Sequence, residues 1–208
     1  MPTPAFDLYL VTDRTQARGR DLLWVLEQAL EGGINAIQLR EKDLGGRDLL
    51  DLAEKTRRLC ERYSASLFIN DRVDVALAVD AAGVQLGKIS LPIETARALL
   101  GPEKLIGASI HSIEEVGPAE QSSADFLLFG PVYFTPSKAG FGAPQGIAAL
   151  RKIVETSALP VYGIGGITAN NIIDVREAGA RGIALIAAII GAENPQEGSR
   201  AMMRLLRS

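Results

Sequence analysis

A run of five residues brings together side chains that could bind an anion, Gln38-Leu39-Arg40-Glu41-Lys42. If the backbone stays extended there, alternation places Gln38, Arg40 and Lys42 on one side. Arginine offers a rigid fork of donors and lysine a compact ammonium group, and the two together suit the oxygens of a phosphate or pyrophosphate. The alternative is that Glu41 and Lys42 only begin a solvated loop.

Two other residues could take part in chemistry. Asp71 follows an apolar run and Asn70, and its carboxylate could hold a Mg²⁺ ion that bridges to a phosphate. Asp71 could equally cap a helix that begins near Val73. His111 is the only histidine, and an imidazole that titrates near neutrality is suited to general acid or base catalysis. A purely structural role is the alternative for His111.

Two glycine-containing segments could hold a phosphate group. In Gly163-Ile164-Gly165-Gly166-Ile167, backbone N–H groups could bind a phosphate that glycine allows to approach closely, or the glycines could only permit a tight turn. The segment 130–142 is rich in Gly, Ser and Pro and is long for a connection in a compact domain. It could close over a ligand, with hydroxyl groups and a charge from Thr135, Ser137 and Lys138.

All these residues follow short apolar runs that alternate with helical patterns along the chain. Strands that are buried on both faces read as near-continuous apolar stretches, so the runs predict parallel strands joined by helices. The predicted strands are 8–11, 36–39, 67–69, 83–86, 105–108, 126–129, 161–164 and 182–186.

The helices between these strands are predicted from apolar residues that recur at helical spacing. The clearest pattern lies in 22–30, where two glycines at 32 and 33 supply a stop. The other predicted helices are 47–63, one that starts at Ser112, one that runs from Thr168 as N-cap toward Gly179, and one that has Pro195 in its first turn.

This alternation predicts a single α/β domain over residues 1–208, a (β/α)8 TIM barrel. The rival is an open doubly wound sheet, which usually carries a glycine-rich turn after its first strand. Val11-Thr12-Asp13-Arg14 contains no glycine. The active site of a barrel lies at the C-terminal ends of its strands, where the residues named above fall.

Composition excludes several classes of function. With 47% hydrophobic and 23% charged residues, the chain is typical of a globular protein. Lys and Arg total 22 against 25 Asp and Glu, which argues against a nucleic-acid partner. The longest apolar run, 182–192, is too short to span a membrane. The lone Cys60 falls on a buried helix face and the first residues lack a signal-peptide pattern, so we predict a cytoplasmic setting.

Taken together, the motifs resemble the thiamine-phosphate synthase (thiamine-phosphate pyrophosphorylase) family, which includes a related thiazole tautomerase. The resemblance covers essentially the whole chain and rests on five motifs in family-like order and spacing: 38–42, 69–72, 107–112, 129–138 and 163–167. It implies a TIM barrel in which aminopyrimidine methyl pyrophosphate loses pyrophosphate. The nitrogen of a thiazole phosphate then captures the carbocation, which gives thiamine phosphate.

The resemblance also implies roles for individual residues. Those implied to hold the pyrimidine substrate and its pyrophosphate are Gln38, Leu39, Arg40, Glu41, Lys42, Asn70, Ser109 and Lys138. Those implied to hold the thiazole phosphate are Thr135, Pro136, Ser137, Gly166, Ile186 and Ala187. The implied catalytic set is Arg40, Lys42, Ser109, His111 and Lys138. The implied magnesium site consists of Asp71 and Ser90.

Two residues depart from the family pattern. Ser90 stands where a second magnesium-binding aspartate is usual, beside an added charge on Lys88, and a neutral hydroxyl is a poorer partner for a hard cation. Ala187 stands where a serine is usual. Loss of the metal aspartate fits a thiazole tautomerase with His111 as acid–base catalyst, and both losses fit a non-catalytic protein that binds phosphorylated ligands. The intact Arg40 and its neighbours favour the synthase. A homodimer is left open.

Overall fold

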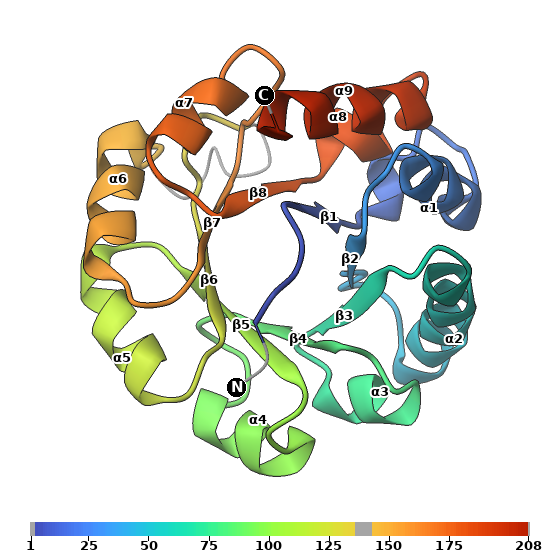
Figure 1. The fold of residues 1–208 in the computed structure, drawn as a ribbon. Coiled ribbons are helices and arrows are strands. Elements are labelled where there is room, and N and C mark those ends of the chain that lie inside the picture. Colours follow the sequence, from blue (N-terminus) through green and yellow to red (C-terminus); the bar gives the residue numbers. More distant parts are fainter. Residues whose placement is uncertain (1–2, 136–142, 208) are drawn as a thin grey trace.

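The computed structural model describes residues 3–135 and 143–207. Its strands are parallel and form a closed barrel, because β1 pairs with β8 as well as with β2 (Figure 1). The predicted TIM barrel is confirmed and the open sheet is excluded. The strands are β1 (Leu8–Val11), β2 (Ala36–Leu39), β3 (Ser66–Asn70), β4 (Gly83–Leu86), β5 (Leu105–Ile110), β6 (Phe126–Phe129), β7 (Val161–Ile164) and β8 (Gly182–Leu185).

Helices surround the barrel and cover the outer faces of the strands (Figure 1). The α-helices are α1 (Leu22–Glu31), α2 (Gly46–Arg62), α3 (Val73–Ala78), α4 (Ile93–Leu100), α5 (Val116–Gln121), α6 (Gly146–Thr156), α7 (Ile172–Glu177), α8 (Ala187–Ile190) and α9 (Pro195–Arg207). The 3₁₀ turns η1 (Arg14–Gln16) and η2 (Ile113–Glu115) follow β1 and β5.

One predicted helix start was wrong. Helix α7 begins at Ile172 with Asn171 as its N-cap residue, not at Thr168. The reason is a local turn: the Thr168 N–H donates to Asn171 Oδ1 at 2.8 Å, and the Asn171 N–H donates back to the Thr168 carbonyl at 3.2 Å. Residues 168–171 therefore form a separate turn, because short polar side chains compete with the helix for backbone groups.

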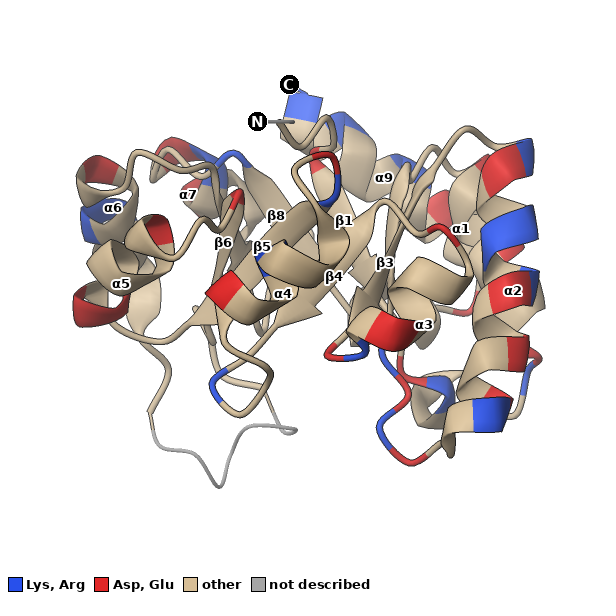
Figure 2. Ribbon diagram, turned by 90° about the horizontal axis from the view of Figure 1, so that it is seen from below, with Lys and Arg blue, Asp and Glu red and all other residues tan. Residues whose placement is uncertain are grey.

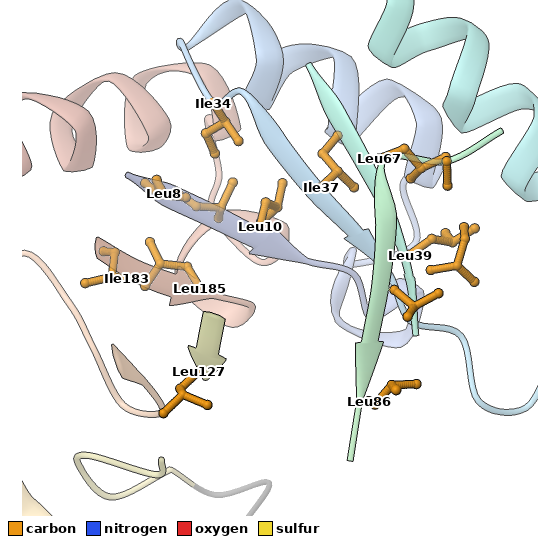
Figure 3. Packing of buried hydrophobic residues seen from close by; sticks show 14 of the residues in the cluster. Leu8, Leu10, Ile34, Ile37, Leu39, Leu67, Leu86, Leu127, Ile183 and Leu185 are labelled. Carbon is orange, nitrogen blue, oxygen red and sulfur yellow. The ribbon is translucent and has the colours of Figure 1, made fainter. Parts of the chain in front are cut away.

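Alternate residues of each strand point outward and form an aliphatic core beneath the helices. Leu8 and Leu10 of β1, Ile37 and Leu39 of β2, and Ile183 of β8 all belong to this cluster (Figure 3). Cys60 of α2 is buried in it as predicted, and burial raises the pKa of its thiol to about 12. The thiol therefore acts as a packed apolar group at neutral pH.

The inward-facing residues form a second, aromatic cluster inside the barrel. Tyr9 lies in register between Ala36 and Ala184, so a large side chain is flanked by two small ones. Phe126 pairs in register with Gly107, where a Cβ atom would lie 2.4 Å from the Phe126 ring. The small residues leave the space that the rings fill, which gives the interior the density of a packed core.

The segment before β1 closes one end of the barrel. It crosses that end before entering the first strand (Figure 1), and Phe6 packs inside against four rings, those of Tyr9, Phe68, Phe126 and Tyr162. Tyr162 donates a hydrogen bond from its hydroxyl to the Phe6 carbonyl at 2.8 Å. The opposite end, at the C-terminal ends of the strands, remains the place where a ligand can enter.

A buried ion pair joins α4 to the start of β6, and we predict a large stability effect there. Arg97 donates to Asp125 Oδ2 and to the carbonyls of Gly101 and Lys104, and the Asp125 side chain is 1% exposed. Arg97→Ala would leave a buried carboxylate without its counter-charge. We expect the free energy of unfolding in urea to fall by about 3–5 kcal/mol.

An exposed arginine gives the matched control for this prediction. Arg200→Ala removes an ion pair with Glu197 on the surface of α9, and we expect a loss below about 1 kcal/mol. Equal losses of unfolding free energy in the two variants would show that the buried pair contributes no more to stability than the exposed pair.

The outer surface carries charges of both signs, which lie side by side on α2 (Figure 2). Within the described residues, no helix is both long enough and apolar enough to cross a membrane.

Candidate active site

The barrel interior changes from aromatic to polar toward the C-terminal ends of the strands. Ala36, Phe68, Gly83 and Gly107 face the inside of the barrel. The residue two positions after each of them lies on the same inward face and is polar. These polar residues are Gln38, Asn70, Gln85 and Ser109.

Several polar atoms of this layer lack a protein partner. Gln85 Nε2 donates to Ser109 Oγ at 3.0 Å. Within the described part of the chain, the buried atoms Gln85 Oε1, Gln38 Nε2 and Tyr9 Oη have no hydrogen bond of normal length, although the Gln38 side chain lies close enough to the Tyr9 hydroxyl to act on its pKa, which it lowers. Burial raises the pKa of the Tyr9 phenol well above its ordinary value, so the phenol stays protonated. Buried polar groups are normally paired, so these atoms are available to polar groups of a ligand.

Two cations stand unpaired at the rim of this polar layer. Arg40 follows β2, and its backbone N–H donates to Thr12 Oγ1 at 2.9 Å. Neither the Arg40 nor the Lys42 side chain makes a hydrogen bond or ion pair with any described residue. Strand β2 ends at Leu39 and Lys42 lies in a turn, so the predicted alternation does not extend to Lys42. Both cations nevertheless remain available to an anion.

The carboxylate of Asp13 lies close enough to Arg40 to respond to its charge. Partial burial acts to raise the pKa of Asp13, but hydrogen bonds from Thr15 and Gln16, with help from the Arg40 charge, lower it overall. Asp13 already accepts from Thr15 and Gln16, and it forms no ion pair with Arg40.

The other two residues of the segment have their side chains engaged elsewhere. Leu39 points outward into the aliphatic core (Figure 3). The Glu41 side chain is 2% exposed and pairs with Arg14. A ligand in the barrel mouth would meet these two residues through their backbone.

Asp71 and Ser90 lie in direct contact. The Ser90 hydroxyl donates to Asp71 Oδ1, Asn70 Nδ2 donates to Oδ2 at 2.7 Å, and the Gly87 N–H donates to Ser90 Oγ at 2.7 Å. Asp71 also has a φ of 62°, an uncommon conformation that tends to persist at functional sites. The alternative role as a helix cap is excluded, because Arg72 is the N-cap residue of α3 and no side chain caps that helix.

These contacts bear on whether a metal ion fits here. Mg²⁺ is usually bound by one or two carboxylates together with substrate phosphates and water. Asp71 supplies one carboxylate and Ser90 an adjacent hydroxyl oxygen, while the described residues contain no group of three or more His, Cys, Asp or Glu that could hold a metal alone. The pair therefore fits an ion that takes its remaining ligands from the substrate.

His111 follows β5 and contacts the loop after β6. Its Nδ1 lies 2.6 Å from the Gly130 carbonyl, which can only accept, so Nδ1 carries the proton. The His111 backbone N–H donates to Glu115 Oε2 at 2.7 Å. The ring thus links two neighbouring loops.

The glycines after β7 pack closely beneath the residues that follow β6. Gly165 and Gly166 have φ values of 97° and 64°, and a Cβ atom on Gly166 would lie 2.4 Å from the Phe134 carbonyl oxygen. Ile186 and Ala187 stand at the start of α8, where the first backbone N–H groups have no intrahelical acceptor. Close packing against the residues after β6 explains why glycines occur at positions 165 and 166. The phosphate site at these glycines stays a prediction.

A family comparison decides the identity of the barrel. The model described as "Thiamine monophosphate synthase" matches residues 8–189, which includes every strand. The chain belongs to the thiamine monophosphate synthase family.

Relatives of the thiamine monophosphate synthase family match over nearly their full length. A Geobacter sulfurreducens protein named "Putative thiamine-phosphate synthase" is 52% identical, with 97% of this chain and 94% of the relative covered. The thiamine-phosphate synthase of Desulfitobacterium hafniense strain Y51 is 42% identical, with 98% of each chain covered. A solved thiamine phosphate pyrophosphorylase from Pyrococcus furiosus superposes with a TM-score of 0.88 at 41% identity, and covers 97% of this chain and 96% of its own.

Three residues of this thiamine monophosphate synthase fold that lie in or support the polar part of the barrel were not predicted from the sequence. Gln85 was visible as a glutamine inside the apolar run 83–86. Tyr9 stands in the first strand with no polar neighbour to distinguish it from a core tyrosine, and Arg14 acts through a contact that only the fold creates.

Thr135 is half-buried, whereas the predicted site residues Pro136, Ser137 and Lys138 lie outside the described residues.

Proposed function

We propose that this protein is a thiamine-phosphate synthase, a transferase that couples aminopyrimidine methyl pyrophosphate with a thiazole phosphate. The bond between the pyrimidine methylene carbon and the pyrophosphate oxygen breaks, and the electron pair leaves with pyrophosphate. The thiazole nitrogen supplies the pair for the new carbon–nitrogen bond. The observation that carries the proposal is that the Arg40 and Lys42 side chains have no hydrogen-bond or ion-pair partner among the described residues and stand beside a polar layer that contains atoms without such a partner.

Arg40 and Lys42 would bind the pyrophosphate and stabilise the charge that develops as it leaves. Stabilisation of developing charge by fixed donors is usually the largest contribution to such a step. Gln38, Asn70 and Ser109, which belong to the polar layer, would hold the pyrimidine ring. The site would also speed the reaction by orienting the two substrates relative to each other.

The second substrate would bind on the opposite side of the mouth. We assign its phosphate to backbone groups of Gly166, Ile186 and Ala187, with Thr135 and the residues predicted after it. Support comes from the closeness of Gly166 to Phe134, which brings the loops after β6 and β7 together.

Mg²⁺ is proposed as the cofactor, held by Asp71 and Ser90. When bound, it would neutralise charge on the departing pyrophosphate. The support is the direct contact between the Ser90 hydroxyl and the Asp71 carboxylate. We also propose a cytoplasmic setting, in keeping with a single buried cysteine that has no partner for an intrachain disulfide.

The decisive experiment mixes purified protein with both substrates, with and without Mg²⁺, and detects thiamine phosphate and pyrophosphate. We expect both products in equal amounts and only with Mg²⁺. Absence of product, while a known synthase reacts under the same conditions, would contradict the proposed function.

Substitution of His111 tests whether its imidazole takes part in the reaction. In a synthase it links two loops, and the amide of His111→Asn can still donate to the Gly130 carbonyl, so we expect kcat/KM for coupling to stay within about threefold of the wild-type value. Loss of a general acid or base usually costs about 10²–10⁴-fold. A loss of that size in a folded variant would place the imidazole in the coupling chemistry and contradict its role as a link between two loops.

A further inference from the structure

Glu41 is a buried carboxylate in the middle of the rim. Its side chain is 2% exposed. Both of its oxygens accept from the Arg14 backbone N–H at 3.2 Å, and Oε2 also accepts from Arg14 Nη1 at 3.0 Å. A buried charge is tolerated where it is paired and hydrogen-bonded, and here one residue of the loop after β1 provides all three bonds.

The same guanidinium also reaches a second acid of the turn. Arg14 Nη1 donates to Asp43 Oδ1 at 2.6 Å and Nη2 donates to Oδ2 at 2.5 Å, which is a bidentate pair. The Leu44 N–H donates to the Glu41 carbonyl at 3.3 Å and closes the turn. Arg14 therefore binds the turn on both sides of Lys42.

The cations of this region divide into two kinds. Arg14 is neutralised by two carboxylates, whereas Arg40 and Lys42 have no ion-pair partner among the described residues. Arg40 is further fixed through its backbone, which donates to Thr12 Oγ1 beside the Arg14 loop. The charge of Arg14 is therefore already balanced by its two acids, whereas the charges of Arg40 and Lys42 are available to an anion.

We propose that Arg14 and Glu41 are positioning residues that hold the turn 40–43 so that Arg40 and Lys42 face the pyrophosphate. This inference rests on the proposed function, and it assigns the Glu41 carboxylate to Arg14 and not to substrate. A substitution that disturbs the pair of Arg14 and Glu41 should therefore weaken binding of the pyrimidine pyrophosphate and leave binding of the thiazole phosphate unchanged.

Steady-state kinetics with both substrates test this selectivity. For Glu41→Gln we expect KM for the pyrimidine pyrophosphate to rise about ten- to a hundredfold, because small misplacement of binding groups has effects of that size. KM for the thiazole phosphate should not change. Arg14→Lys, which keeps the charge but loses the fork, should give a smaller rise of the same kind.

Two further variants separate positioning from folding. Asp43→Asn alters the 62% exposed member of the cluster and should fold normally, with a small rise in the same KM. Asp7→Asn is the matched control, because Asp7 pairs with Arg181 at 2.6 Å and joins neighbouring strands at the opposite end of the barrel. We expect no change in either KM for Asp7→Asn.

The double variant Arg14→Lys/Glu41→Gln tests whether the two residues act as one unit. If they do, its KM for the pyrimidine pyrophosphate should be no higher than that of the worse single variant. Additive effects, equal rises in both KM values, or wild-type KM values in folded Glu41→Gln and Arg14→Lys would each overturn the inference.

Calorimetric titration with inorganic pyrophosphate distinguishes this inference from the proposed function. Weaker pyrophosphate binding by Glu41→Gln supports the positioning role even if the wild-type protein forms no thiamine phosphate. Coupling by the wild type together with unchanged pyrophosphate binding in that variant would overturn the positioning role alone.

Discussion

Arg40→Ala is expected to lower kcat/KM for coupling by about 10²–10³-fold, the usual cost of removing one fixed donor from a developing negative charge. The side chain has no hydrogen bond or ion pair with the described residues, so its removal leaves no buried group unpaired. We therefore expect the variant to fold with an unchanged melting temperature. Initial rates of thiamine phosphate formation measure the effect.

Two substitutions support the interpretation of this result. Arg40→Lys keeps the charge but loses the planar fork, and it should recover only part of the activity. Arg204→Ala removes an exposed arginine on α9, far from the mouth, and should leave coupling unchanged. Full activity in folded Arg40→Ala would rule out the proposed pyrophosphate site.

The second large effect is expected at the pair of Asp71 and Ser90. Asp71→Asn removes the carboxylate of the proposed magnesium site and should lower coupling at moderate Mg²⁺ by about a hundredfold or more, because the ion provides several kcal/mol of charge stabilisation. Ser90→Asp adds a second carboxylate. It should lower the Mg²⁺ concentration for half-maximal activity about tenfold, because hard cations prefer carboxylate ligands.

Direct binding of Mn²⁺, followed by electron paramagnetic resonance, measures the same site without turnover. Ser90→Asp should bind Mn²⁺ more tightly than the wild type, and Asp71→Asn more weakly. Asp74→Asn is the control, because Asp74 lies on α3 and pairs with Arg72 at 2.5 Å. If Mn²⁺ affinity and Mg²⁺ dependence are the same in all three variants, the ion is not held by Asp71 and Ser90.

The barrel could be predicted because each strand has a simple local pattern. The apolar run 126–129 became β6 with the same bounds, since a strand covered on both faces needs apolar residues throughout. The start of α7 could not be predicted in the same way. Thr168 and Asn171 are both good N-cap residues, and only their mutual hydrogen bonds decide which one begins the helix.

The sequence predicts which types of residue form the site better than it predicts the role of each residue. Asp71 and Ser90 are far apart in sequence, and their contact depends on how the loops after β3 and β4 meet. Glu41 resembled its neighbours in a polar segment, and only the fold shows that Arg14 covers its carboxylate. Contacts between separate loops of this kind have no local pattern in the sequence.

Closure of the barrel by its first and last strands has a consequence for synthesis of the chain. Strand β1 pairs with β8, and the Ile183 N–H donates to the Asp7 carbonyl at 2.9 Å. During translation β1 therefore lacks one of its two neighbours until β8 has left the ribosome. An unpaired strand edge readily joins other chains, so the emerging polypeptide is exposed to aggregation at β1 until β8 closes the barrel.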